Sequence, residues 1–265
     1  MSKYEDVMTW VFKRGYRKGS RVVQFDRTDL TAACEALGVP LIKNLGDIPY
    51  TFRFRRDLPG EIQATAPKGC DWIIEGVGTA VYRFRLAQPG KISPTPHRDP
   101  IKIPDATPEI VRQYAPGTDE QALLTRVRYN RLVDLFTGLT CYSIQNHLRT
   151  TVEGVGQIEV DEIYFGVSRR GAHYAIPCQA KSPGDRFGIV QVMQDAALCA
   201  LKYPNAICKP IALQFTGEND VAILEFVVRE DGDLMKLAVV DERHYRLVPR
   251  SELSAAELAR MRREE

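Results

Sequence analysis

The chain has 265 residues and a formal net charge of +2, with 44% hydrophobic and 26% charged residues. This composition is that of an ordinary globular protein, and it excludes a chain that is disordered throughout, a collagen and a coiled coil. No apolar run approaches the ~20 residues that span a bilayer, and the acidic N-terminal stretch does not resemble a signal peptide, so we expect a cytoplasmic protein without a membrane segment.

The six cysteines are scattered without a CxxC pair, and the four histidines lie far apart in the sequence. This spacing argues against a zinc finger or a zinc ribbon. Most of the cysteines have apolar neighbours, so we expect them to behave as small core residues in a reducing compartment.

Residues 1–86 are predicted to form a small domain that begins with helices and ends in a hairpin. Apolar residues at helical spacing predict a first helix over 4–12 and a second over 29–37. Residues 51–57 alternate apolar and basic side chains, which indicates a strand, and residues 72–86 read as two strands joined by a Gly-rich turn. Helices followed by a basic hairpin indicate a winged-helix-like domain.

Basic residues gather in this first segment, which holds 14 Lys and Arg against 10 Asp and Glu. A basic cluster interleaved with aromatic residues can contact DNA phosphates, although a solvated helix end is the alternative. Arg and Asn are also suited to reading guanine and adenine edges. The candidate DNA-binding residues of this segment are Lys13, Arg14, Arg17, Lys18, Lys43, Asn44, Arg53 and Arg55.

Residues 87–118 contain seven prolines. Proline breaks helices and removes backbone donors, so this segment is predicted to be a linker or an extended wrap. It separates the first domain from a second domain over 119–265.

The second domain is predicted to open with a helix, because Thr118 and Gln121 form a capping-box pattern. Arg128 and Arg131 fall on the apolar stripe of this helix. Buried arginines need anionic partners, which are either carboxylates of the protein or DNA phosphates.

Alternating strands are expected next, over 142–152, 157–167 and 172–181, with an SRRG turn between the last two. A helix over 187–203 follows, with Ile189, Val192, Ala196 and Ala200 among the residues on its apolar face, and then strands over 206–215 and 221–228. The predicted order is therefore α-β-β-β-α-β-β, an α/β (α+β) fold with a mixed sheet flanked by helices.

Strand periodicity brings a set of polar side chains together in this sheet. Glu159 and Asp161 share one strand face, and Gln179 and Lys181 share a face of the next strand, so the four converge if the hairpin aligns them. Mg²⁺ prefers oxygen ligands, which Asp161, the Gln179 amide or the Ala180 carbonyl can supply. Lys181 would then orient or deprotonate the attacking water, or stabilise charge that develops on a phosphate.

An acid on one strand and a (D/E)xK sequence on the next, within this order of elements, resembles the PD-(D/E)xK nuclease superfamily, which has the restriction-endonuclease-like fold. The motif stands here as VD at 160–161 and QAK at 179–181, and the resemblance covers about residues 119–228. It implies a Mg²⁺-dependent DNA endonuclease without an organic cofactor, with Asp161 as metal ligand and Lys181 as catalytic lysine.

The chain departs from that pattern at two positions, because Val160 replaces the proline and Gln179 replaces the second acid. The second change removes a charged ligand, for which Glu159 could compensate. Two alternatives therefore stand beside the nuclease: a nuclease-fold protein that binds DNA with little or no cutting, and a structural protein in which Asp161 and Lys181 form a cross-strand ion pair. No GxSxG or HExxH sequence is present, which argues against Ser/His/Asp hydrolase and zinc-protease chemistry.

The expected partners are double-stranded DNA and a second copy of the chain, because one active site per chain cuts two strands most simply as a two-fold dimer. A basic N-terminal module on a nuclease core resembles restriction enzymes whose extra domain reads DNA, and some of those enzymes require modified cytosine. A methylation-dependent site is therefore one form that this activity could take.

Overall fold

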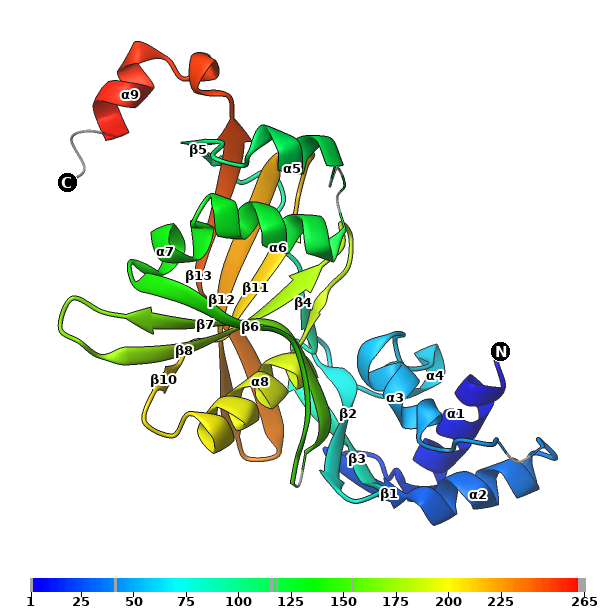
Figure 1. Ribbon diagram of the computed structural model, residues 1–265. Coiled ribbons are helices and arrows are strands. Elements are labelled where there is room, and N and C mark those ends of the chain that lie inside the picture. Colours follow the sequence, from blue (N-terminus) through cyan, green and yellow to red (C-terminus); the bar gives the residue numbers. More distant parts are fainter. Residues whose placement is uncertain (1, 41, 115–116, 118, 154, 262–265) are drawn as a thin grey trace.

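The computed structural model describes residues 2–40, 42–114, 117, 119–153 and 155–261 as a mixed α/β protein (Figure 1). Helices flank a large mixed sheet, so this part of the predicted fold is confirmed. Among the described residues, no helix is both long and apolar enough to cross a membrane.

Helices and a hairpin make up the N-terminal part of the chain. Its elements are α1 (Lys3–Gly15), β1 (Val22–Asp26), α2 (Arg27–Ala36), α3 (Asp47–Phe54), α4 (Gly60–Gln63), β2 (Asp71–Gly78) and β3 (Val81–Gln88). The predicted first helix and the hairpin over 72–86 are confirmed. Strand β3 lies between β1 and β2 and is antiparallel to both.

Helix α2 begins two residues earlier than the sequence indicated. The Asp26 carboxylate accepts the backbone N–H groups of Thr28 and Asp29, and the Asp29 side chain accepts the N–H of Asp26 in return. This reciprocal capping box satisfies N–H groups that have no partner within the helix, so the helix starts where the box places it.

The prediction of a strand over 51–57 is wrong, because residues 47–54 form α3. Ile48 and Phe52 are one helical turn apart and both are buried against the N-terminal core. Pro49 lies in the first turn, where a helix does not need the missing N–H. Burial of this face outweighs the local alternation of apolar and basic residues that indicated a strand.

The N-terminal elements surround a hydrophobic cluster of their own. The Phe12 ring packs edge-on against Trp72 and Phe84, with ring centroids 5.1 and 5.0 Å apart. Such edge-to-face pairs add to the stabilisation from burial. Helix α1 is thereby fixed on the hairpin.

The sheet of the N-terminal part continues into the C-terminal part. Ala87 on β3 pairs in parallel with Met235 on β13 (Leu234–Val248). Beside this pairing the buried guanidinium of Arg85 donates to the backbone carbonyls of Gly232 and Asp233. The two halves of the chain therefore share one continuous sheet.

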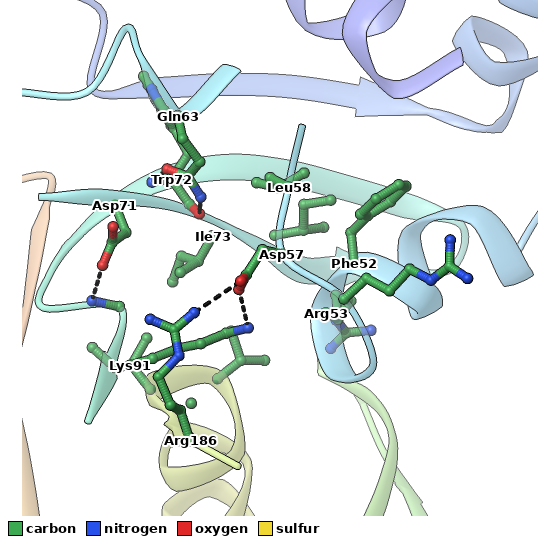
Figure 2. Close-up of a pocket in the computed structure, with 16 residues that line it drawn as sticks. Phe52, Arg53, Asp57, Leu58, Gln63, Asp71, Trp72, Ile73, Lys91 and Arg186 are labelled. Atoms are coloured by element: carbon green, nitrogen blue, oxygen red, sulfur yellow. Dashed lines mark hydrogen bonds and ion pairs between the residues drawn. The ribbon is translucent and has the colours of Figure 1, made fainter. Parts of the chain in front are cut away.

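Two further contacts join the halves. Gly76 lies so close to the backbone of Val155 that a Cβ at this position would be 2.8 Å from the Val155 carbonyl oxygen. The Asp57 carboxylate contacts the amine of Lys91 and, at 2.8 Å, the guanidinium of Arg186 (Figure 2). This junction between the two halves contains a cavity, described below.

The proline-rich segment lies along the sheet. Its elements are β4 (Lys91–Ile92), β5 (Ile101–Pro104) and α5 (Glu109–Tyr114). Strand β4 pairs with β9 (Phe187–Gly188), and β5 pairs in parallel with β13.

The C-terminal part contains the remaining elements. They are α6 (Glu120–Tyr129), α7 (Leu132–Thr137), β6 (Thr140–Val152), β7 (Gly156–Val167), β8 (His173–Lys181), β9, α8 (Ile189–Lys202), β10 (Ile207–Cys208), β11 (Ile211–Phe215), β12 (Asp220–Asp231), β13, the 3-10 turn η1 (Arg250–Glu252) and α9 (Ala255–Met261). The strands run in the order β6-β7-β8-β11-β12-β13, in which β8 and β11 are parallel and the other neighbours are antiparallel. Helices α6 and α8 cover opposite faces (Figure 1).

The predicted order of the main elements is confirmed, with β13 as an addition. The strand is long but its hydrophobic pattern is broken, and its pairing with β12 shifts register at Glu225 and Phe226. The buried face of α8 is rotated relative to the predicted apolar face. Ala196 and Ala200 are exposed, while Asp195 and Cys199 are buried.

The start of α6 and the position of Arg131 differ from the prediction. Thr118 lies outside the described residues, and the side chain that caps the helix is that of Asp119, which accepts the N–H of Ala122. The predicted inward orientation of Arg131 is wrong. Arg131 lies between α6 and α7 with a φ of 49°, so the chain turns there and α7 runs in a new direction. The Arg131 side chain is exposed and pairs with Asp134.

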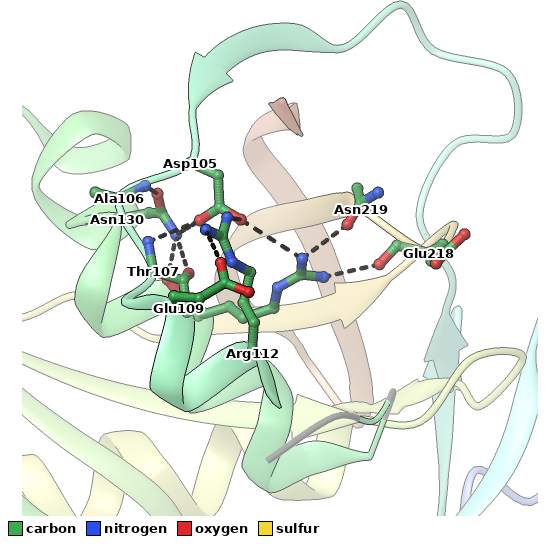
Figure 3. A network of polar contacts seen from close by, with 9 residues as sticks. Asp105, Ala106, Thr107, Glu109, Arg112, Asn130, Glu218 and Asn219 are labelled. Carbon is green, nitrogen blue, oxygen red and sulfur yellow. Dashed lines mark hydrogen bonds and ion pairs between the residues drawn. The ribbon is translucent and has the colours of Figure 1, made fainter. Parts of the chain in front are cut away.

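A polar network fastens the proline-rich segment to α6 (Figure 3). The Asn130 amide donates to Asp105 and Thr107 and to the Arg126 carbonyl, and its oxygen accepts the N–H of Ala106. Arg126 continues the network to the loop before β12, where it donates to the Glu218 carbonyl and the Asn219 side chain. Asn130 is buried, so its bonds leave no amide group unpaired.

Asn130→Ala should therefore lower the free energy of unfolding by about 1–3 kcal/mol, the cost of leaving buried polar groups without partners. Urea unfolding followed by circular dichroism measures this change. The control Asn146→Ala, at an exposed position of β6, should stay within about 0.5 kcal/mol of the wild type. An equal effect of the two substitutions would show that the network does not stabilise the fold.

Candidate functional site

The backbone pairing of β7 with β8 gives way to a side-chain contact at Asp161. The paired residues run from Val167 opposite His173 to Glu162 opposite Cys178. One residue further, the Asp161 carboxylate accepts the backbone N–H of Ala180 at 2.8 Å. The carboxylate is thus bound to the neighbouring strand, on which Gln179 and Lys181 lie, as the sequence predicted for these residues.

Gln179 is buried and its amide group has a defined orientation. Its Nε2 donates to the Glu159 carbonyl at 3.1 Å and to the Asp195 carboxylate of α8 at 3.0 Å. Both amide protons are therefore used, and the amide oxygen is the atom that remains for another partner.

Asp195 was not identified from the sequence, because it lies outside the predicted apolar face of α8. It is 1% exposed. Burial raises the pKa of its carboxyl well above the ordinary value, while the bond from Gln179 opposes the shift. A polar residue within an apolar helix face is the signal that could have identified it.

Glu120, in the first turn of α6, is the second missed residue. Burial raises the pKa of its carboxyl, the charge of Lys181 lowers it, and the charges of Asp161 and Asp185 raise it further. Glu120 therefore lies within the electrostatic field of the predicted site. Acids are common in the first turn of helices, so its sequence position alone carries no such signal.

Asp161 lies in a similar environment. Burial raises the pKa of its carboxyl, while the Ala180 N–H and the charge of Lys181 lower it. The charge of Glu159 acts in the raising direction and that of His147 in the lowering direction. The charge of Lys181 therefore lowers the pKa values of both Asp161 and Glu120.

Four oxygen donors of this region are of the type that a hard divalent cation prefers. They are the Asp161 and Glu120 carboxylates, the Gln179 amide oxygen and the Ala180 carbonyl, all oxygen atoms of the kind that Mg²⁺ binds together with water. Among the described residues, no group of three or more His, Cys, Asp or Glu side chains is arranged to hold a metal. Mg²⁺ commonly has only one or two carboxylate ligands, so this set is compatible with it.

The Glu159 side chain points elsewhere. Its carboxylate pairs with Arg149 on β6 at 2.9 Å, and its backbone carbonyl accepts the Gln179 amide. Glu159 therefore contributes to the site through its main chain.

The predicted DNA-binding residues at the end of α1 are exposed. Lys13 pairs with Glu61 of α4, and Arg14 pairs with Asp29 at 3.5 Å and lies over the Trp10 ring. The Arg17 guanidinium donates to backbone carbonyls of its own turn. Lys18 is also exposed, so all four side chains face solvent.

The predicted recognition residues divide into two groups. Lys43, Asn44 and Arg55 are exposed, with Asn44 donating to Asp47 and Arg55 stacked over Tyr50.

Arg53 instead lies between the two halves of the chain. Its Nη2 donates to the Val155 carbonyl at 3.5 Å, and burial lowers the pKa of its guanidinium. In the C-terminal part, Arg128 pairs with Glu162 at 2.9 Å. Glu162 is fully buried, so this pair supplies the anionic partner that an inward Arg128 requires.

Comparison with models of protein families, with curated proteins and with solved structures finds no match to this chain.

Asp195→Asn tests whether the buried Asp195 carboxylate, which accepts the Gln179 amide, lowers the stability of the fold. Asparagine still accepts the Gln179 amide but carries no charge. Because the folded-state pKa of Asp195 is raised, the wild type loses stability as pH rises above the ordinary Asp value of about 3.9. We expect the variant to match the wild type near pH 4 and to exceed it in thermal stability increasingly toward pH 7. A stability difference that does not change with pH would contradict this environment for Asp195.

Proposed function

We propose that the chain is a divalent-metal-dependent endonuclease that cuts double-stranded DNA, with the active site at Asp161, Gln179, Lys181 and Glu120. One observation carries this proposal. Asp161 and Glu120 are two half-buried carboxyl groups whose pKa values are raised by burial, and both interact electrostatically with Lys181 of the QAK strand. A purely structural ion pair needs one acid and one lysine, so that role does not explain the second acid.

The arrangement of the sheet supports the proposal. The three antiparallel strands β6, β7 and β8 are followed by α8 and by β11, which is parallel to β8. This is the α-β-β-β-α-β order expected from a PD-(D/E)xK core. In the N-terminal part, the strand order β1-β3-β2 with helices against it is compatible with a winged-helix-like domain.

Asp161, Glu120, the Gln179 amide oxygen and the Ala180 carbonyl are the groups that would hold the cation. When bound, Mg²⁺ would polarise the phosphodiester and make water a better nucleophile. Asp161 is positioned for this by the Ala180 N–H. The Gln179 oxygen is oriented by the two bonds of its amide nitrogen.

Lys181 would act directly on the substrate. Its ammonium group can stabilise the negative charge that develops on the phosphate, and it can orient the attacking water. It is half-buried, and it forms no ion pair within 4.0 Å among the described residues, so the amine is available to a phosphate.

DNA binding and assembly are part of the same proposal. The exposed basic residues at the end of α1 and before α3 would contact the duplex, and the N-terminal part would read its sequence. Cutting both strands with one site per chain requires two subunits or two successive events, so we propose a homodimer on DNA.

Asp161→Ala and Lys181→Ala should each lower Mg²⁺-dependent cleavage of plasmid DNA by several orders of magnitude, because one removes a metal ligand and the other the charge next to the phosphate. Lys202→Ala, on the exposed end of α8, is the matched control and should cut at the wild-type rate. Cleavage assays on a panel of methylated and unmethylated duplexes measure activity and site preference together. If the wild type binds DNA but does not cut it, the alternative of an inactive nuclease fold is favoured. If it neither binds nor cuts DNA, a structural protein is favoured.

Gln179→Glu tests the role of the amide. A glutamate would place a second carboxylate against Asp195 and would lose both donated bonds, so we expect reduced cleavage and a lower melting temperature. Asp195→Asn in the same chain supplies a donor for the new carboxylate. The double variant should recover stability and regain cleavage, and this non-additivity is measured by a double-mutant cycle. Additive losses would show that Gln179 and Asp195 act independently.

A further inference from the structure

A cavity of about 190 Å³ lies at the junction of the two halves of the chain, and we call it the junction cavity (Figure 2). Its walls come from the loop after α3, from β2, from the segment around Lys91 and from the start of α8. None of the proposed active-site side chains lines it, so it is a separate site.

One side of the junction cavity is apolar. Phe52, Leu58, Ile73 and Ile189 contribute to it, and each is buried in a hydrophobic cluster. These side chains are held by the two cores, so the wall is rigid. It would favour a flat, weakly polar ring over a charged group.

Four other lining residues are basic. Arg53, Arg56, Lys91 and Arg186 line the cavity. The acids there are Asp57 and Asp71, and the Asp71 carboxylate accepts the N–H of Gly90 at 3.0 Å.

Asp57 alone faces two of these cations. Its carboxylate contacts Lys91 and Arg186. The hydrogen bond from Lys91 lowers its pKa, and the charges of both cations add to that effect against a smaller cost of burial. Asp57 is therefore ionised near neutral pH, and an incoming anion would compete with it for the same two groups.

The start of α8 adds to the positive field. The helix has 14 residues, its N-cap, Gly188, lines the cavity, and the N–H of Ile189 donates to the Gly90 carbonyl at 3.0 Å. The positive end of the helix dipole therefore acts in the same direction as the lysine and the arginines.

We propose that the junction cavity binds a nucleotide. The phosphate would contact Arg56, Lys91 and Arg186 at the start of α8, in place of Asp57, and the base would lie against Leu58 and Ile73. Guanidinium and ammonium groups match the oxygens of a phosphate. The volume is below the ~300–1,000 Å³ of pockets that enclose drug-sized ligands, so the cavity would hold part of one nucleotide and leave the rest of it in solvent.

Two sources can supply the ligand of the junction cavity: a nucleotide of a bound DNA strand or a free nucleotide. Arg186 lies in the loop that follows Lys181, so this short loop connects the proposed active site with the cavity. The proposal goes beyond cleavage, and it can be tested without metal.

Isothermal titration of the full chain at low ionic strength, in the absence of divalent metal, tests binding of dAMP, dGMP, dCMP and dTMP. Inorganic phosphate is titrated in parallel. We expect at least one nucleotide to bind more tightly than phosphate. Arg186→Ala and Lys91→Ala should weaken that binding by about tenfold or more, because each removes a charge-assisted contact.

Asp57→Asn should change the nucleotide affinity in the opposite direction. It removes the competing carboxylate charge and should tighten nucleotide binding several-fold. The matched control is the exposed pair of Lys236 and Asp231, which resembles the Lys91 and Asp57 pair but lies away from the cavity. Lys236→Ala and Asp231→Asn should leave the affinity unchanged. Thermal melts confirm that each variant is folded.

A second titration, with fluorescent duplex DNA, identifies the source. If the occupant belongs to the DNA strand, the free nucleotide will compete with the duplex and Asp57→Asn will tighten both. If it is a free nucleotide, the duplex affinity will not change. The proposal is overturned if no nucleotide binds in the millimolar range, if phosphate alone binds as tightly, or if Asp57→Asn does not strengthen binding. Cleavage plays no part in these measurements, so their failure is independent of the nuclease assignment.

Discussion

The carboxylate of Asp161 takes the place of a sheet hydrogen bond, and the proposed active site depends on that substitution. A buried N–H group must find an acceptor, and at Ala180 the acceptor is a side chain of the neighbouring strand rather than its backbone. This contact fixes a charged group between two strands, where burial raises its pKa. Burial of this carboxylate lowers the stability of the fold. Such a loss of stability is common at functional sites.

Helix α8 connects the features that surround the site. Its Asp195 side chain orients Gln179 from below the sheet, and its first residues form one wall of the junction cavity. Gly188 and Asp195 are about two helical turns apart, so both regions belong to one rigid element. A ligand at the start of α8 and a substrate at Lys181 would therefore contact neighbouring parts of one packed unit.

The two halves of the chain are also linked by more than the proline-rich segment. The sheet pairing of Ala87 with Met235 and the buried bonds of Arg85 hold the N-terminal hairpin on the C-terminal sheet. Close packing of Gly76 against Val155 adds a contact that admits no side chain at that position. The N-terminal part is therefore held in one orientation relative to the proposed active site.

Local sequence sufficed to predict the main helices and strands of the C-terminal part and the proximity of Asp161 to the QAK strand, because alternation along a strand is a short-range property. It failed at residues 51–57, where packing of Ile48 and Phe52 favours a helix over the local pattern. Glu120, Asp195 and the Asp57 contacts at the junction became visible only in the folded chain. Each of them acquires its role from residues far away in the sequence, through burial and charge that no local spacing encodes.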